Sequence, residues 1–266
     1  PLCVDIEVAS ICDLACPFCY RSYIATPDKL IEDELAYAII DQASDLGVPS
    51  MKFNWRGEPL LHPRLEKFIS YAKQKGILET IINTNATQLT SARASSLIDS
   101  GIDVIIYSFD GASKETYEKN RPGRFSYNSF ERVVENIRSF SKVRASLGKN
   151  LPFTKIQMIL TSETFNEQSE FYNLFHDCVD SVTVTQYSER GGNLDDLTEQ
   201  DRDEIERLCQ KYDIDSSFPI SYMKSSTGEI SISVKRKPCE QPFQRLLVTY
   251  DGRVSMCCYD WGAKYT

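Results

Sequence analysis

The sequence alternates six times between short apolar segments and longer amphipathic segments over its first 212 residues. Short apolar runs rich in β-branched residues are typical of strands, whereas apolar residues three and four positions apart are typical of helices. A strict order of strand and helix predicts a parallel sheet with right-handed crossovers. The predicted strands cover residues 4–8, 51–55, 80–83, 104–109, 155–160 and 182–186, and the predicted helices lie around 35–46, 65–72, 90–98, 130–140, 171–175 and 205–212.

This alternation permits either an open doubly wound sheet or a curved partial barrel. The polar motifs follow the C-terminal ends of predicted strands, which is where a βα barrel gathers its active-site loops. We therefore favour the partial barrel. Residues 110–127 are predicted to form a long polar loop, and 214–237 a connector with little periodicity. Residues 246–257 predict a β-hairpin, because the pair Asp251-Gly252 suits a tight type I′ turn.

Composition limits the class of protein. The chain has 266 residues and a formal net charge of −8, with 41% hydrophobic residues, which is enough for one large α/β domain with a small appendage. The negative charge disfavours a nucleic-acid partner. No apolar run approaches the roughly 20 residues that cross a membrane, so we expect no membrane association. Without an export signal, nine cysteines indicate metal binding rather than disulfides.

Three cysteines follow the first predicted strand closely. Cys12, Cys16 and Cys19 are spaced CxxxCxxC on a short loop, and soft thiolates in such a group bind zinc or an iron–sulfur cluster. A closed site needs a fourth protein ligand, which no nearby residue supplies. One metal position would then stay open to a small molecule. The alternatives are a zinc site and three cysteines that merely share a turn.

The cysteine spacing, with the aromatic Phe18 before the last cysteine, resembles the radical S-adenosylmethionine (SAM) superfamily. The resemblance implies an open, TIM-like partial (β/α)6 barrel and a [4Fe–4S] cluster whose open iron chelates SAM. It also implies reductive cleavage of SAM to methionine and a 5′-deoxyadenosyl radical, which abstracts a hydrogen atom from a substrate. In relatives the aromatic at the position of Phe18 packs against adenine, although Phe18 alone is equally suited to a core position.

The tetrapeptide Arg56-Gly57-Glu58-Pro59 follows the second predicted strand and is similar to the Gly-Gly-Glu motif of that superfamily. The motif holds the amino group of SAM, so the resemblance assigns Gly57 and Glu58 to cofactor binding. The sequence departs from the motif because Arg56 stands where the first glycine is expected. Read alone, the tetrapeptide is an ordinary exposed turn.

Two later loops supply further candidates for SAM binding. The resemblance points to Ser108 and Arg121 as partners of the SAM carboxylate, for which a guanidinium fork is well suited. Asn85 is a candidate on the ribose side. The alternatives are an Asx turn at Asn85 and a solvated surface charge at Arg121.

The C-terminal segment resembles the opening half of the SPASM domain, an extension that binds auxiliary [4Fe–4S] clusters. Cys239, Gly252 and Cys257 have the matching spacing, and Cys258 is an alternative ligand. The later cysteines of that pattern are absent. We therefore predict a radical SAM barrel over 1–212 and, over 213–266, a connector with the first part of a truncated SPASM-like domain.

These features predict a radical SAM enzyme, with oxidoreductase chemistry as the expected class. The substrate is a small polar, carbohydrate-like metabolite or, alternatively, a peptide. A flavodoxin or ferredoxin is the expected electron donor, and oxygen-sensitive clusters indicate a reducing, cytoplasmic setting. The competing hypothesis is a non-catalytic iron–sulfur module that only relays electrons.

Overall fold

We describe a computed structural model of the chain, which covers residues 1–22, 24, 26–186, 199–211, 221–224, 230–233, 240–255, 257, 260 and 262–263. The chain divides into two compact units. The first unit joins Pro1–Tyr187 to Gln241–Thr266, and the second is Ser188–Glu240. The domain boundary predicted between residues 212 and 213 does not coincide with the boundaries of these compact units. It divides the chain by family resemblance, into a radical SAM barrel and a SPASM-like segment, and stays a prediction.

The first unit is built on an eight-stranded sheet with the order β10-β9-β1-β2-β3-β4-β5-β6. Strands β1 to β6 are parallel neighbours in chain order, as six strand–helix units predict. This confirms the mostly parallel α/β fold, of the partial TIM-like kind. The strands are β1 (Cys3–Ile6), β2 (Ser50–Lys52), β3 (Glu79–Thr84), β4 (Val104–Ser108), β5 (Phe153–Leu160), β6 (Ser181–Gln186), β9 (Arg245–Val248) and β10 (Val254–Ser255).

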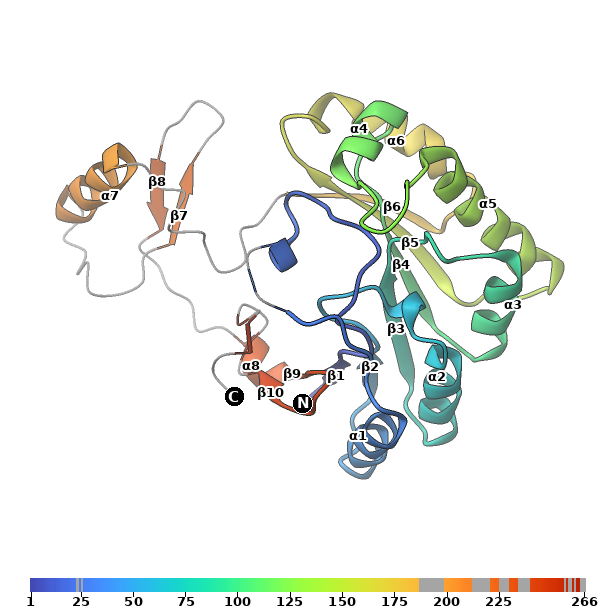
Figure 1. The fold of residues 1–266 in the computed structure, drawn as a ribbon. Helices are drawn as coiled ribbons and strands as arrows, with labels where there is room; N and C mark the ends of the chain where they lie inside the picture. Colours follow the sequence, from blue (N-terminus) through green and yellow to red (C-terminus); the bar gives the residue numbers. More distant parts are fainter. Residues whose placement is uncertain are drawn as a thin grey trace. The chain divides into compact units, whose positions relative to one another are not determined.

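Helices cover one side of this sheet, and the long loop after β1 lies on the other side (Figure 1). Glycine follows most of these helices within three residues of the last helical residue. The helices are α1 (Asp33–Asp45), α2 (Leu65–Gln74), α3 (Ser91–Asp99), α4 (Lys114–Asn120), α5 (Phe130–Ser146), α6 (Gln168–Phe175) and the short α8 (Gln241–Gln244), with 3-10 turns at Tyr20–Ser22, Pro59–Leu61 and Phe165–Glu167.

The core lies between the helices and the sheet. Alternate strand residues such as Ile82, Ile105 and Ile156 are fully buried there. Phe109, just beyond β4, centres an aromatic cluster in which its ring stacks on Tyr117 at 4.0 Å and meets Phe175 edge-on at 4.9 Å. The intervening strand residues point to the opposite face, which we call the inner face.

The predicted polar loop over 110–127 is wrong in part, because α4 forms within it. Ser113 caps this helix by accepting a hydrogen bond from the backbone N–H of Thr116 at 3.2 Å, and Glu115 lies in the first turn. A serine followed by an acidic residue was the sequence signal for a helix start. The helix has only seven residues and few apolar ones, so periodicity did not reveal it.

The C-terminal hairpin forms, but with a different turn from the one predicted. The N–H of Thr249 donates to the carbonyl of Arg253, so the loop contains three residues, Tyr250 to Gly252. Of these, only Gly252 has positive φ, at 83°, whereas a type I′ turn needs two such residues. β9 also pairs in parallel with β1, which places the hairpin in the same sheet as the six barrel strands.

The second unit contains α7 (Glu199–Lys211) and an antiparallel pair, β7 (Ser221–Lys224) and β8 (Ile230–Ser233). Helix α7 corresponds to the last predicted helix. The β7–β8 pair was not predicted, and it lies in the stretch expected to be a connector.

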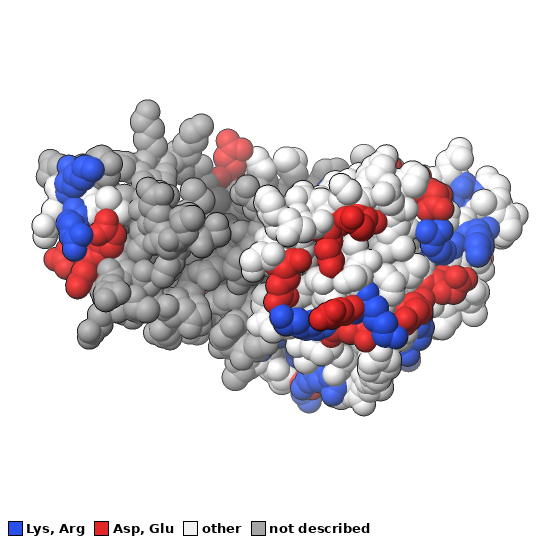
Figure 2. Space-filling view, turned by 90° about the horizontal axis from the view of Figure 1, so that it is seen from above, with Lys and Arg blue, Asp and Glu red and all other residues white. Residues whose placement is uncertain are grey.

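On the face shown in Figure 2, acidic and basic side chains of the described residues lie interspersed rather than in one patch of a single sign. None of the described helices combines the length and the apolar character needed to span a bilayer.

Candidate functional site

The three cysteines lie on the loop between β1 and α1. Cys16 is buried, whereas Cys12 and Cys19 are half-buried, and all three are free thiols. Burial raises the pKa of Cys16 to about 11, against the opposing effect of the nearby Arg121 guanidinium. Burial likewise raises the pKa of Cys12. A metal that binds these thiols must therefore displace their protons.

The side chain of Asp13 anchors this loop to the loop after β3. Its carboxylate accepts hydrogen bonds from Asn85 Nδ2 at 2.9 Å, Thr87 Oγ1 at 2.6 Å and Gln88 Nε2 at 2.9 Å. Asp13 lies next to Cys12, so these bonds fix the backbone beside the first thiol. Sequence reasoning missed this residue, and its position beside the motif was the only available signal.

Gly57 allows the cysteine loop to pack directly against the segment after β2. A Cβ atom at Gly57 would lie 2.3 Å from the carbonyl oxygen of Ala9 and 2.4 Å from that of Ile11. The N–H of Glu58 donates to the Ile11 carbonyl at 2.8 Å. The glycine is therefore required for close approach between two backbone segments.

The carboxylate of Glu58 is buried and bound by groups of the protein. It accepts hydrogen bonds from Leu60 N at 3.0 Å, Thr84 Oγ1 at 2.7 Å and Asn85 N at 2.8 Å. Burial raises the pKa of Glu58 to about 7, although these donors favour the charged form. Glu58 thus joins β2 to the end of β3, and its predicted contact with a SAM amino group stays a prediction.

Asn85 occupies the point where these contacts meet. Besides Asp13, its Nδ2 lies 3.9 Å from the sulfur of Cys12, and its Oδ1 accepts from the N–H of Thr87. Ala86, the next residue, has a positive φ of 60° while fully buried. Such a conformation is uncommon outside glycine and is concentrated at functional sites.

Arg121 is buried and paired rather than solvated. Its Nε donates to Asp110 Oδ2 at 2.8 Å, while Asp110 Oδ1 accepts from the N–H of Ile159 at 2.7 Å. The segment after Arg121 also holds the cysteine loop, since Ala15 N donates to Pro122 O at 2.8 Å. The alternative of a solvated surface charge at Arg121 is therefore wrong.

Ser108 ends β4 on the inner face, opposite Gln157 of β5. Phe18 lies half-buried in the cysteine loop. Among the auxiliary-cluster candidates, Cys257 is half-buried just after β10, whereas Cys239 and Cys258 lie outside the described residues. The roles predicted for these residues stay predictions.

Within the described ranges, no three His, Cys, Asp or Glu side chains are arranged to hold one metal ion. The three thiols thus share a loop without forming a site for one metal ion. In a [4Fe–4S] cluster each cysteine binds a different iron, so its ligands lie farther apart than those of one zinc ion. A donor set of three soft thiols fits such a cluster.

A buried ion pair that the sequence did not predict lies beside the loop. Arg56 Nε donates to Glu7 Oε1 at 2.6 Å, with side-chain exposures of 4% and 0%, and the guanidinium lies 4.4 Å from the Trp55 ring centroid. Glu7 also accepts from Tyr250 N at 3.3 Å. Arg56, the departure from the family motif, therefore links β1, β2 and the C-terminal hairpin.

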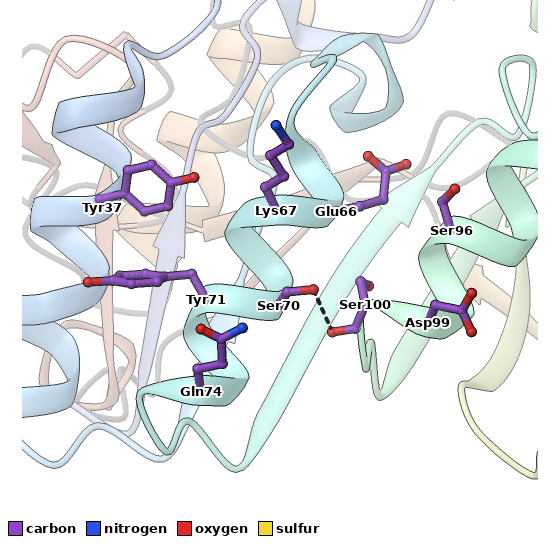
Figure 3. A pocket seen from close by; sticks show the side chains of 9 residues that line it. All are labelled: Tyr37, Glu66, Lys67, Ser70, Tyr71, Gln74, Ser96, Asp99 and Ser100. Carbon is purple, nitrogen blue, oxygen red and sulfur yellow. Dashed lines mark hydrogen bonds between the residues drawn. The ribbon is translucent and has the colours of Figure 1, made fainter.

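A depression of about 650 Å³ lies elsewhere, over helices α1, α2 and α3 (Figure 3). Two of its side chains are bonded to the protein: Ser70 donates to the Ser100 carbonyl and Tyr71 donates to Asp41. It lies on the helix side of the sheet and holds none of the predicted site residues.

Comparisons with known proteins agree with this geometry. A profile of the Radical SAM superfamily matches residues 6–173. The tungsten-containing aldehyde ferredoxin oxidoreductase cofactor-modifying protein of Pyrococcus furiosus is 24% identical over 168 residues, which are 62% of this chain and 45% of that protein. PqqA peptide cyclase of Rhizobium meliloti is 32% identical over 120 residues, 45% of this chain and 32% of that protein.

Among solved structures, Streptococcus suis SuiB bound to its precursor peptide SuiA superposes with a TM-score of 0.69 at 17% identity. That match covers 100% of this chain and 61% of SuiB. At this identity the likeness concerns the fold alone.

Proposed function

Since the chain belongs to the radical SAM superfamily, we propose that it cleaves SAM reductively to activate a substrate by hydrogen abstraction. Its cofactors are accordingly a [4Fe–4S] cluster and SAM. When bound, these cofactors supply a 5′-deoxyadenosyl radical formed by one-electron cleavage of the SAM sulfonium. The observation that carries the proposal is the cysteine loop, which three separate loops at the C-terminal edge of the sheet hold in place.

The residues of the chain have distinct roles in this proposal. Cys12, Cys16 and Cys19 hold the cluster. Asp13 fixes the loop and orients Asn85. Asn85 donates toward the sulfur of Cys12, and a hydrogen bond to a metal ligand tunes that ligand. Arg121, oriented by Asp110, lies close enough to Cys16 to act on its charge.

The SAM-binding roles follow from the family resemblance. Ser108 and Arg121 bind the carboxylate of SAM, and Phe18 packs on its adenine. The segment at Gly57 and Glu58 lies beside the amino group, and Asn85 lies on the ribose side. Glu58 acts chiefly by fixing β2 to β3, since its described donors all belong to the protein.

The test is anaerobic reconstitution with iron and sulfide, followed by SAM and dithionite. We expect 5′-deoxyadenosine in the wild-type reaction and only background in a Cys16→Ala control. Equal amounts in the two reactions would reject the proposal. Iron that is retained and reduced without SAM cleavage would support the competing electron-relay function.

The match spans less than half of the curated relatives named above, so the substrate is itself a proposal. A peptide is favoured by SuiB, solved with its precursor peptide, and by PqqA peptide cyclase. The small carbohydrate-like substrate remains the other candidate, and no comparison reported above supports it. Incubation with each class and measurement of substrate-dependent 5′-deoxyadenosine decides between them.

Three further features complete the proposal. An auxiliary cluster bound by Cys239 and Cys257 rests on their spacing, and it could accept an electron in a net oxidation. A flavodoxin or ferredoxin would supply the first electron. Oxygen-sensitive clusters suit a reducing, cytoplasmic setting, so aerobic purification with full iron content would count against this setting.

A further inference from the structure

Four polar side chains gather on the inner face, near the C-terminal ends of β3 and β4 and in the first five residues of β5. Ile156 and Met158 are fully buried in the helix-side core. Lys155 precedes Ile156 and Gln157 lies between the two buried residues, so both point to the inner face. The same alternation places Asn83 and Ser108 there. We call Asn83, Ser108, Lys155 and Gln157 the inner-face row.

The strand register brings this row together. Ser108 lies opposite Gln157, while Asn83 and Lys155 lie on either side of Ile106 in the next layer of the sheet. Because neighbouring strands are about 4.8 Å apart, Asn83 and Lys155 are about 10 Å apart at their backbones. Side chains of this length can reach one small ligand from both sides.

The row has unmet hydrogen-bonding capacity. The Oδ1 atom of Asn83 is buried and has no hydrogen-bond partner among the described residues. Buried polar atoms almost always have a partner in the protein, in water or in a ligand. Across the described residues, no hydrogen bond or ion pair engages the side chains of Ser108, Lys155 or Gln157 either.

Lys155 differs in its ion pairing from other charged groups on this face. Arg245 is paired with Asp5 at 2.9 Å, and Arg56 is paired with Glu7 at 2.6 Å. Lys52 lies opposite Asp5 in the strand register. Lys155, in contrast, has no carboxylate within ion-pair distance among the described residues, in a chain whose net charge is −8.

We infer that three members of the inner-face row, Asn83, Lys155 and Gln157, bind a carboxylate group of the substrate, whereas Ser108 keeps its proposed role toward SAM. Lys155 supplies the counter-charge, and the Nδ2 group of Asn83 and the Nε2 group of Gln157 donate hydrogen bonds to the carboxylate. Asn83 Oδ1 accepts from a donor group elsewhere on the same substrate. One ammonium balances the single charge of a carboxylate, whereas a phosphate monoester carries about −1.5 to −2 at neutral pH. The inference deepens the proposed function and rests on it, because it assigns a substrate class to the inner face of the same sheet.

The first test measures protection of Lys155 in the wild-type holoenzyme. The reconstituted protein, saturated with SAM, is acylated with trace acetic anhydride, and the labelling of each lysine is read by peptide mass spectrometry. N-acetyl-aspartate amide at about twice its dissociation constant should slow labelling of Lys155 about threefold. Exposed Lys149 is the internal control, and its labelling should not change.

Matched ligands identify the group that is bound. N-acetyl-asparagine amide, which lacks the charge, should not protect Lys155. Gluconate against glucose repeats the comparison for a sugar acid, so the two pairs distinguish a peptide carboxylate from a sugar carboxylate. Protection by inorganic phosphate alone, by SAM alone, or by none of these ligands would overturn the inference.

A variant provides the second measurement. In Lys155→Met, affinity for the protecting carboxylate should fall about tenfold by ligand-observed NMR, whereas Lys149→Met should leave it unchanged. Unchanged affinity in Lys155→Met would also overturn the inference. Formation of 5′-deoxyadenosine by the wild-type protein is measured in parallel. If no 5′-deoxyadenosine forms, the proposed function is rejected, whatever the carboxylate-binding experiments show.

Discussion

The two faces of the same strands differ sharply in what their side chains do. On the helix side, residues such as Ile105 and Ile156 are fully buried in a continuous apolar core. On the inner face, the alternate residues of the same strands are partly exposed, and apolar residues such as Val104 and Ile106 lie among polar ones such as Ser108 and Lys155. Apolar burial is therefore concentrated on the helix side, whereas the inner face carries the residues for which we propose ligand binding. A shift of one residue along a strand separates the two.

The largest expected effect is on the helix side. Phe109→Ala should lower the free energy of unfolding by about 3–5 kcal/mol, because it leaves a cavity among Tyr117, Phe171 and Phe175. Urea unfolding measures this loss of stability, from the transition in which the first unit unfolds. A loss below about 1 kcal/mol would show that the core collapses around the missing ring, and that the contrast between the faces is weaker than the burial indicates.

The next largest effect is expected when the ion pair between Arg56 and Glu7 on the inner face is broken. Arg56→Met should cost about 3 kcal/mol by urea unfolding, because it leaves the carboxylate of Glu7 buried without its counter-charge. The double variant Glu7→Leu/Arg56→Met removes both charges and should recover most of that loss. If the double variant is less stable than the single one, the pair contributes more than charge compensation.

A smaller effect is expected where the inner-face loops meet. Asp13→Asn replaces a carboxylate that accepts three hydrogen bonds, so the cysteine loop should bind its cluster about tenfold more weakly. Iron content after chelator challenge measures this. Exposed Asp45→Asn is the matched control, and equal iron loss in the two variants would remove Asp13 from the site.

The smallest effect on stability is expected from Ser108→Ala, adjacent to Phe109. Its free energy of unfolding should stay within about 0.5 kcal/mol of wild type, because Ser108 lies partly exposed outside the core. SAM binding, in contrast, should weaken measurably by equilibrium dialysis. Intact SAM affinity would leave Ser108 without the role that the family resemblance assigns.

Features that depend on local sequence were predictable. The six strands of the barrel and the helices that follow them have clear periodicity, and the cysteine loop was recognisable by its spacing. Thr90, a favoured N-cap residue type at the start of the predicted helix over 90–98, caps α3 by accepting from Arg93 N. These elements follow from patterns within about a dozen residues.

Features that depend on distant segments were not predictable. The pair between Glu7 and Arg56 joins residues 49 positions apart, and neither residue carries a signal of the other. Arg56 was recognised only as a departure from the motif. The donors on Asp13 lie 72 to 75 residues away. Periodicity identifies which face a residue occupies, but it does not identify its partner.

The pairing of β9 with β1 has a consequence for synthesis. Arg245 and Asp5, which form an ion pair across these strands, are 240 residues apart. At about 5–20 residues per second, a ribosome needs roughly 10 to 50 s between the two. During that interval one edge of β1 has no neighbouring strand. The strand that leads into the cysteine loop therefore gains its second neighbour only after β2 to β6 have been synthesised.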